Sequence, residues 1–150
     1  MVHDNLLDLN LLRSPSNPDP DADMGVHEFT YSLFPHENDL INSDTIHESS
    51  CLNQEPLLFD GVRSSATIPI QLKGNGLDLA VLKKAEKEDC LIVRVVETHG
   101  RKSVGSLLFQ GTITECNLIE WENISDAKQV DSEMPLQLSP FEIKTFKIKL

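Results

Sequence analysis

Short runs in which apolar and polar residues alternate follow one another along most of this chain, and turn residues separate them about every eight to twelve residues. Alternation with a period of two is typical of strands that bury one face, so the pattern predicts an all-β fold arranged as a sandwich. In the last run, apolar residues fall on both faces. The predicted strands are residues 5–13, 26–34, 66–72, 77–85, 90–98, 104–109, 112–118, 134–138 and 141–150.

Two segments depart from simple alternation. Between His36 and Leu52 the few apolar residues are spaced as on a helix, which predicts one short helix there. Residues 77–85 fit either an amphipathic helix or a strand. The charged turn 86–89, followed at once by the strand 90–98, favours a β-hairpin.

The net charge of the chain is concentrated in its first 60 residues. They hold 12 of the 24 Asp and Glu residues but only one basic residue, Arg13, which gives a net charge of −11, equal to that of the whole chain. We therefore expect two units, residues 1–60 and 61–150, of different surface character. The acidic segment is expected either to lie against another part of a larger protein, to meet a polyhydroxylated or cationic ligand, or to be a solvated face.

Composition excludes several classes of protein. A sequence pI near 4.7 argues against binding to nucleic acid or to anionic membranes. No apolar stretch is long enough to span a bilayer, and the first ten residues lack the basic flank and apolar run of a secretion signal. The three cysteines, Cys51, Cys90 and Cys116, form no C-x-x-C motif, so a reducing, cytoplasmic location is predicted.

Two groups of residues invite a metal-site interpretation that their spacing does not support. Asp19, Asp21 and Asp23 imitate the start of a calcium-binding loop, but the required glycine and the closing bidentate acid are missing. A turn whose carboxylates cap backbone amides is the favoured alternative. Three histidines fit no known ligand pattern and are expected to be hydrogen-bonded structural residues; they are His27, His36 and His47.

Catalytic motifs are equally scarce. The sequence contains no nucleophile elbow, no phosphate-binding loop and no dinucleotide fingerprint. Acid–base hydrolysis needs two facing carboxyl groups with different pKa values. Asp21 and Asp23 lie two residues apart in a loop, and Glu97 is expected to form a structural ion pair with Arg94. Neither arrangement predicts a catalytic pair of carboxyl groups. We therefore predict no catalytic and no metal-binding residue in this chain.

Several strings, taken together, resemble one family. They are LNLLRSP with PDPDADMG, HEFTYSLFPH, VLKKAEKEDCLIVRVVETHG and the closing LSPFEIKTFKIKL. With these strings in the family's order, the chain resembles the C-terminal β region of α-mannosidases of glycoside hydrolase family 38. The resemblance is to the bacterial and the cytosolic or vacuolar branch of that family. Two stretches, residues 54–75 and 120–133, contribute little to the resemblance.

The resemblance implies a fold and an activity. Residues 1–60 would be the end of a large β-sandwich with one short helix, packed on the catalytic domain, and residues 61–150 a small antiparallel β-sandwich. The family hydrolyses terminal α-mannosides with retention, and zinc or another divalent metal lies in an N-terminal catalytic domain that is expected to be absent here. The implied partners are the enzyme's own catalytic and helical domains and the α-mannoside. Self-association into a homo-oligomer would also agree with the resemblance.

The resemblance also implies two substrate-proximal residues, Arg13 and Asp23, because the loop of residues 13–25 matches one that approaches the active-site rim in the family. An Arg13–Asp23 ion pair that closes the loop is the structural alternative. Two other functions stay open, a stand-alone carbohydrate-binding sandwich and a structural interaction domain. If the chain is a fragment of such an enzyme, residues 1–60 are expected to form an incomplete sheet, with an unpaired edge and apolar surface that the absent domains would cover.

Overall fold

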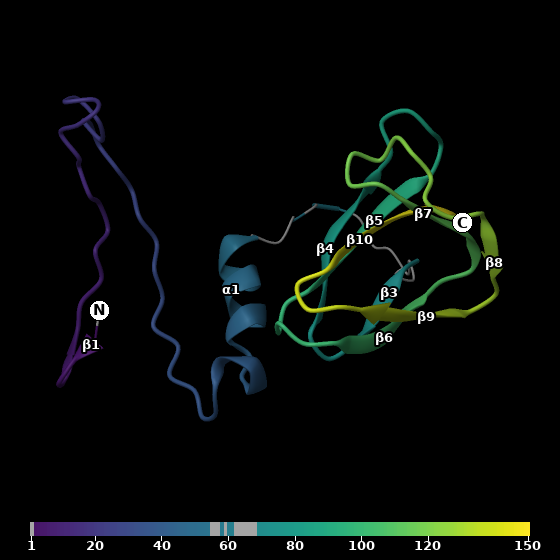
Figure 1. Ribbon diagram of the computed structural model, residues 1–150, viewed down its shortest axis with the longest axis horizontal. Helices are drawn as coiled ribbons and strands as arrows, with labels where there is room; N and C mark the ends of the chain where they lie inside the picture. The colour runs from purple at the N-terminus through teal and green to yellow at the C-terminus, as the bar shows by residue number, and fades with distance from the viewer. Residues whose placement is uncertain (1, 55–57, 59, 62–68) are drawn as a thin grey trace. The chain divides into compact units, whose positions relative to one another are not determined.

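The computed structural model describes residues 2–54, 58, 60–61 and 69–150 and divides into two compact units, Met1–Pro35 and His36–Leu150 (Figure 1). The sequence-predicted boundary between residues 60 and 61 adjoins segments outside the described residues and stays a prediction. No helix within the described ranges is long and apolar enough to cross a membrane.

The first unit contains little regular structure. Strand β1 (Val2–His3) pairs antiparallel with β2 (Leu6–Leu7), and the remainder to Pro35 forms no strand. The predicted strands 5–13 and 26–34 are therefore wrong beyond Leu6–Leu7. An isolated strand is not stable because its backbone groups need a partner, and beyond Leu6–Leu7 these two segments are not paired into a sheet in the described part of the chain. Their alternating apolar side chains are exposed, among them Leu9, Leu11, Val26, Phe29, Tyr31 and Leu33.

The second unit begins with the predicted short helix. A 3-10 turn, η1 (Leu40–Asn42), precedes α1 (Thr45–Asn53). The Asp39 carboxylate caps the turn, since its Oδ1 accepts a hydrogen bond of 2.9 Å from the Asn42 amide. The short helix predicted between His36 and Leu52 is thus confirmed.

Residues from Gln71 onwards form two antiparallel sheets, as predicted for a small β-sandwich (Figure 1). The larger sheet has the strand order β4-β5-β10-β7-β8, and the smaller one has the order β3-β6-β9. The strands are β3 (Gln71–Gly74), β4 (Leu77–Lys84), β5 (Leu91–Glu97), β6 (Ser103–Leu108), β7 (Gly111–Cys116), β8 (Lys128–Val130), β9 (Glu133–Leu138) and β10 (Ile143–Lys149).

The hydrophobic core lies between the two sheets. Val93 of β5 stands opposite Phe146 of β10, and both side chains are buried in it. β6 and β9 close the core from the smaller sheet with Leu107, Leu136 and Leu138. This arrangement accounts for the inward-facing half of the alternating sequence pattern, because residues at every second position share one face.

The predicted hairpin is confirmed, since β4 and β5 pair antiparallel around the 86–89 turn. Most other predicted strands of this unit are also formed, although β3 covers only the end of the predicted strand 66–72, whose residues 66–68 lie outside the described residues. β8 was not predicted. It is three residues long and contributes a single buried side chain, Val130, so its sequence carries too little alternation to be recognised.

Candidate functional site

The loop that carries the two predicted substrate-proximal residues is closed by a carboxylate. Asp23, at a positive φ of 62°, accepts a hydrogen bond of 3.0 Å from the Ser14 amide through its Oδ2. No ion pair between Arg13 and Asp23 occurs in the described part of the chain, so the alternative of an Arg13–Asp23 pair is wrong. The carboxylate instead fixes the backbone beside Arg13, whose side chain is exposed.

The acidic cluster of the same loop behaves as a capped turn. Asp19 Oδ1 accepts a hydrogen bond of 3.0 Å from the Asp21 amide, which confirms the favoured alternative to a calcium site. His27 donates from Nε2 to the Asp23 carbonyl at 2.9 Å, and its ring stacks on Phe29. Across the described residues, no group of three or more His, Cys, Asp or Glu side chains is placed to hold a metal ion.

Glu97, at the end of β5, does not pair with Arg94, and this sequence prediction is wrong. Only 1% of Glu97 is exposed, and its carboxylate joins two loops. Burial by itself raises the pKa of Glu97, but hydrogen bonds outweigh it and lower the pKa to about 2. The donors are the Phe141 amide at 2.9 Å, Ser103 Oγ at 2.9 Å, the His99 amide at 3.0 Å and the Gly100 amide at 2.8 Å.

Arg94 and Glu97 are three residues apart on one strand, and the period of two places them on opposite faces. Arg94 lies on the outer face of the larger sheet, where it donates to Thr145 Oγ1 at 3.1 Å on β10. The same guanidinium contacts Glu120 Oε1 at 3.1 Å and the Leu118 carbonyl at 2.9 Å. It thereby fastens the loop between β7 and β8 onto the sheet.

A second charged residue lies on this outer face. Lys147 of β10 pairs across the sheet with Ile92 and Thr114 and is only 7% exposed. Its ammonium group forms an ion pair with Glu88 from the β4–β5 turn. The Glu88 hydrogen bond raises the pKa of Lys147 and lowers that of Glu88, against the opposite effect of burial.

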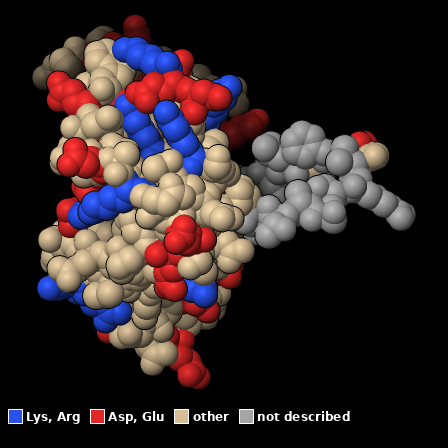
Figure 2. Space-filling model, turned by 90° about the vertical axis from the view of Figure 1, so that its right-hand side faces the viewer, with Lys and Arg blue, Asp and Glu red and all other residues tan. Residues whose placement is uncertain are grey.

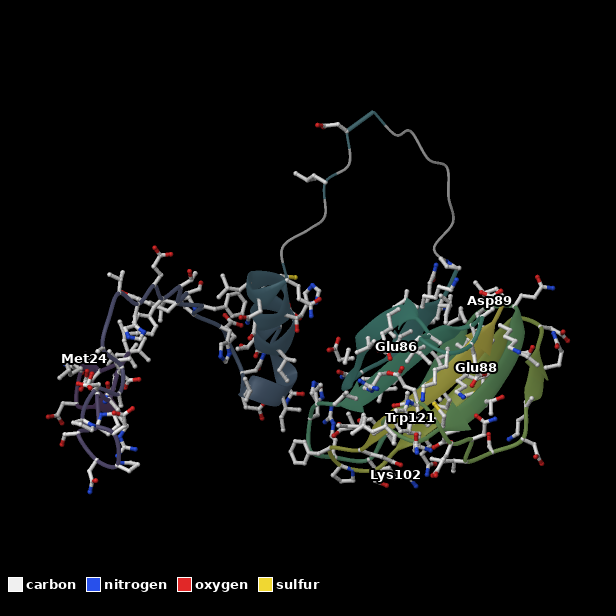
Figure 3. All side chains as sticks on the ribbon, turned by 90° about the horizontal axis from the view of Figure 1, so that it is seen from above. Met24, Glu86, Glu88, Asp89, Lys102 and Trp121 are labelled. Carbon is white, nitrogen blue, oxygen red and sulfur yellow. The ribbon has the colours of Figure 1, made fainter. Side chains whose placement is uncertain are left out.

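The two loops that cover the outer face enclose a pocket of about 270 Å³, here called the Trp121 pocket. Trp121 and Ile119 line it from the β7–β8 loop, and Lys87 Nζ lies 3.6 Å from the centre of the Trp121 ring. Figure 3 shows Trp121, Glu86 and Glu88 over the same part of the sandwich. The charged lining residues are Lys83, Lys87, Lys147, Glu86, Glu88 and Glu120.

Sequence reasoning did not identify this pocket. Its residues come from β4, β10 and two loops that are far apart in the chain, and residues 120–133 contribute little to the family resemblance. One signal was present, a lysine between the two core residues Phe146 and Ile148. A lysine at a strand centre that is covered on both faces needs a partner, because a buried unpaired charge is costly.

Basic and acidic side chains are interspersed over the face of the sandwich drawn in Figure 2. This agrees with the balanced charge of residues 61–150 and shows no broad patch of one sign on that face. That face therefore favours neutral or locally paired contacts over binding to a polyanion.

Comparison with known proteins identifies the sandwich. Residues 76–146 match the model of the glycosyl hydrolases family 38 C-terminal beta sandwich domain. The chain is 34% identical to "Alpha-mannosidase G" of Dictyostelium discoideum over 93% of its own length and 14% of that protein. It is 32% identical to "Alpha-mannosidase 2C1" of Mus musculus, over 99% of the chain and 15% of the relative.

A third relative gives the same result. "Alpha-mannosidase" of Saccharomyces cerevisiae is 30% identical over 98% of this chain and 16% of the relative. The chain thus spans only about one sixth or less of the length of these relatives. The family resemblance noted in the sequence is confirmed: residues 76–146 form a glycosyl hydrolases family 38 C-terminal beta sandwich domain, and nearly the whole chain is similar to proteins named as alpha-mannosidases.

Proposed function

We propose that this chain is a non-catalytic C-terminal β region of an α-mannosidase, whose other domains hydrolyse terminal α-mannosides with retention of configuration. The observation that carries the proposal is the similarity of 93–99% of the chain to three proteins named as alpha-mannosidases. Within such an enzyme, the sandwich would support the catalytic and helical domains and would not take part in bond cleavage.

The chemistry of retaining hydrolysis agrees with a non-catalytic role for the sandwich. It needs a nucleophilic carboxylate and a second carboxyl group about 5–5.5 Å apart on either side of the glycosidic bond. The buried carboxylate of Glu97 is already engaged with backbone amides, and the half-buried carboxylate of Glu120 with Lys83 and Arg94. The described residues offer no donor set for zinc or another divalent metal, so we assign the metal to the catalytic domain.

Turnover of an aryl α-mannoside tests this function. We expect no hydrolysis by the 150-residue chain, and metal-dependent hydrolysis by the polypeptide that its whole reading frame encodes. Replacing the matching region of the yeast relative by this chain should preserve that enzyme's activity, whereas deleting the region should abolish it. Hydrolysis by the purified 150-residue chain itself would overturn the proposal.

We also propose that Arg13 and Asp23 lie near the substrate of the whole enzyme. The support is local: Asp23 holds the Ser14 amide, which fixes the backbone next to the exposed Arg13 side chain. In the whole enzyme, R13A and D23N should raise KM for a mannoside several-fold with a smaller effect on kcat. K102A, on the sandwich, is the matched control and should change neither constant, and an unchanged KM in both loop variants would contradict the assignment.

The remaining proposals concern the surroundings of the chain. The exposed apolar side chains of residues 6–34 support docking of the first unit onto the catalytic and helical domains of the same enzyme. All three cysteines are free thiols, which supports a cytoplasmic location that cell fractionation would test. Self-association into a homo-oligomer stays a prediction, to be measured by light scattering.

A second candidate function, carbohydrate binding by the sandwich, is favoured by the exposed Trp121 beside its pocket.

A further inference from the structure

We propose that the Trp121 pocket binds one neutral sugar ring, which stacks on the Trp121 indole and exchanges hydrogen bonds with the charged side chains around it. The inference deepens the carbohydrate-binding candidate function by naming its site and its ligand class. It is carried by the geometry of the pocket on the outer face of the larger sheet.

The indole offers the apolar surface that such a ring needs. Trp121 is 63% exposed even with the Lys87 ammonium over its ring, so much of its surface remains accessible. The flat C–H faces of sugar rings pack on aromatic rings, whose π-face is electron-rich. The neighbouring Ile119 is also exposed and extends this apolar wall.

The charge of the lining favours a neutral ligand over an ion. Three lysines and three glutamates line the pocket, so their formal charges cancel. The most buried cation, Lys147, is neutralised by Glu88, and Glu120 by Lys83 and Arg94. An anion or a cation would therefore gain little net attraction, whereas hydroxyl groups can accept from ammonium groups and donate to carboxylates.

The polar groups are held in place before any ligand arrives. Lys83 and Lys147 project from strands of the sheet, and Arg94 anchors Glu120 and the Leu118 carbonyl. The turn before the indole is fixed as well, because Asn117 Oδ1 accepts a hydrogen bond of 3.0 Å from the Trp121 amide. Preorganisation of this kind reduces the entropy lost on binding.

The size of the pocket limits the ligand to about one ring. Pockets for drug-sized ligands occupy about 300–1,000 Å³. The Trp121 pocket, at about 270 Å³, lies just below that range. A monosaccharide unit, or the terminal unit of a longer glycan, is the corresponding ligand class.

Titration of the 150-residue chain with methyl α-mannoside tests the proposal. Because Trp121 is the single tryptophan, its fluorescence reports on this site alone. We expect a saturable change in emission with a dissociation constant of about 1 mM, and the same constant by calorimetry. Methyl α-glucoside and methyl α-galactoside, titrated in parallel, would show which ring hydroxyls are recognised.

Variants separate stacking from other effects. By calorimetry, W121A should weaken binding at least about tenfold, and W121F should retain most of it. Y31A removes an equally exposed aromatic residue of the first unit and should leave binding unchanged. Circular dichroism checks that each variant is folded.

Two results would overturn the proposal: no saturable response to any of the three glycosides, or tighter binding of inorganic phosphate than of the glycosides. Neither result would affect the α-mannosidase assignment, which the turnover assay tests independently. Conversely, binding by a chain without hydrolytic activity would leave the pocket assignment in place.

Discussion

At the scale of single residues, Glu97 is a buried carboxylate that accepts four hydrogen bonds within the sandwich. Its two oxygens accept from donors in the β5–β6 loop, on β6 and in the β9–β10 loop, so one side chain sets the relative position of all three. Hydrogen bonds to an ionised group are roughly twice as strong as neutral ones. A neutral replacement of the same shape therefore cannot reproduce this site.

The stability of the chain should depend on pH through Glu97. Its pKa is lowered from 4.5 to about 2 in the folded state, so the unfolded chain binds this proton more readily. The contribution is present above the ordinary pKa and is lost as the pH falls from about 5 to about 2, with a slope of up to about 1.4 kcal/mol per pH unit. Urea unfolding at a series of pH values measures it.

The E97Q variant isolates this effect. Its amide group would present N–H donors to backbone donors, so we expect a loss of about 2–4 kcal/mol at neutral pH. The part of the acid dependence due to Glu97 should disappear in E97Q and remain in E133Q, which changes an exposed glutamate. Parallel pH profiles of the wild type and E97Q would contradict the role of Glu97.

The three thiols should differ in reactivity. Burial raises the pKa of Cys90 and of Cys116, and both side chains are buried, so few thiolates form and reagents reach them slowly. Cys51 is exposed on α1. A disulfide reagent added to the native chain should titrate one fast thiol, and C51S should remove that phase. Three equally fast thiols would show that the sandwich is open in solution.

At the scale of elements, the sequence was informative where a strand contributes its own apolar alternation and a partner lies nearby in the chain. The β4–β5 hairpin was predictable on these grounds. β8 was not, because it is short and contributes one buried residue, Val130. The Trp121 pocket was not predictable either, since its parts meet only through the pairing of β5, β10 and β7, which are distant in sequence.

The close approach of β3 to β6 depends on glycine. A Cβ at Gly105 would lie 2.2 Å from the Lys73 carbonyl oxygen and 2.6 Å from Leu77 Cδ1. G105A must therefore push β3 away from β6, and we expect a loss of about 2–3 kcal/mol in the free energy of unfolding. V104A, at the exposed neighbouring position, should cost about 1 kcal/mol or less. Equal losses in chemical denaturation would contradict the steric argument.

At the scale of the whole molecule, the two units differ in how far they satisfy their own sequence pattern. The second unit buries its alternating residues between two sheets. The first unit has the same alternation in residues 26–34 but leaves Val26, Tyr31 and Leu33 exposed. Alternation in sequence therefore predicted extended segments there, whereas strand formation also requires a partner edge, which the described residues of this unit do not provide.

Hydrogen exchange of the 150-residue chain should report this difference directly. β5 and β10 lie inside the larger sheet with a strand on each side, so amides in residues 90–98 and 141–150 should exchange slowly. Residues 5–13 and 26–34 include only the two paired residues of β2, and most of their amides should exchange rapidly. The comparison requires a monomer, verified by light scattering, because pairing between copies would protect the same segments. Equal protection of both units in a monomer would mean that the first unit completes a sheet within this chain, and its proposed docking onto other domains would lose its support.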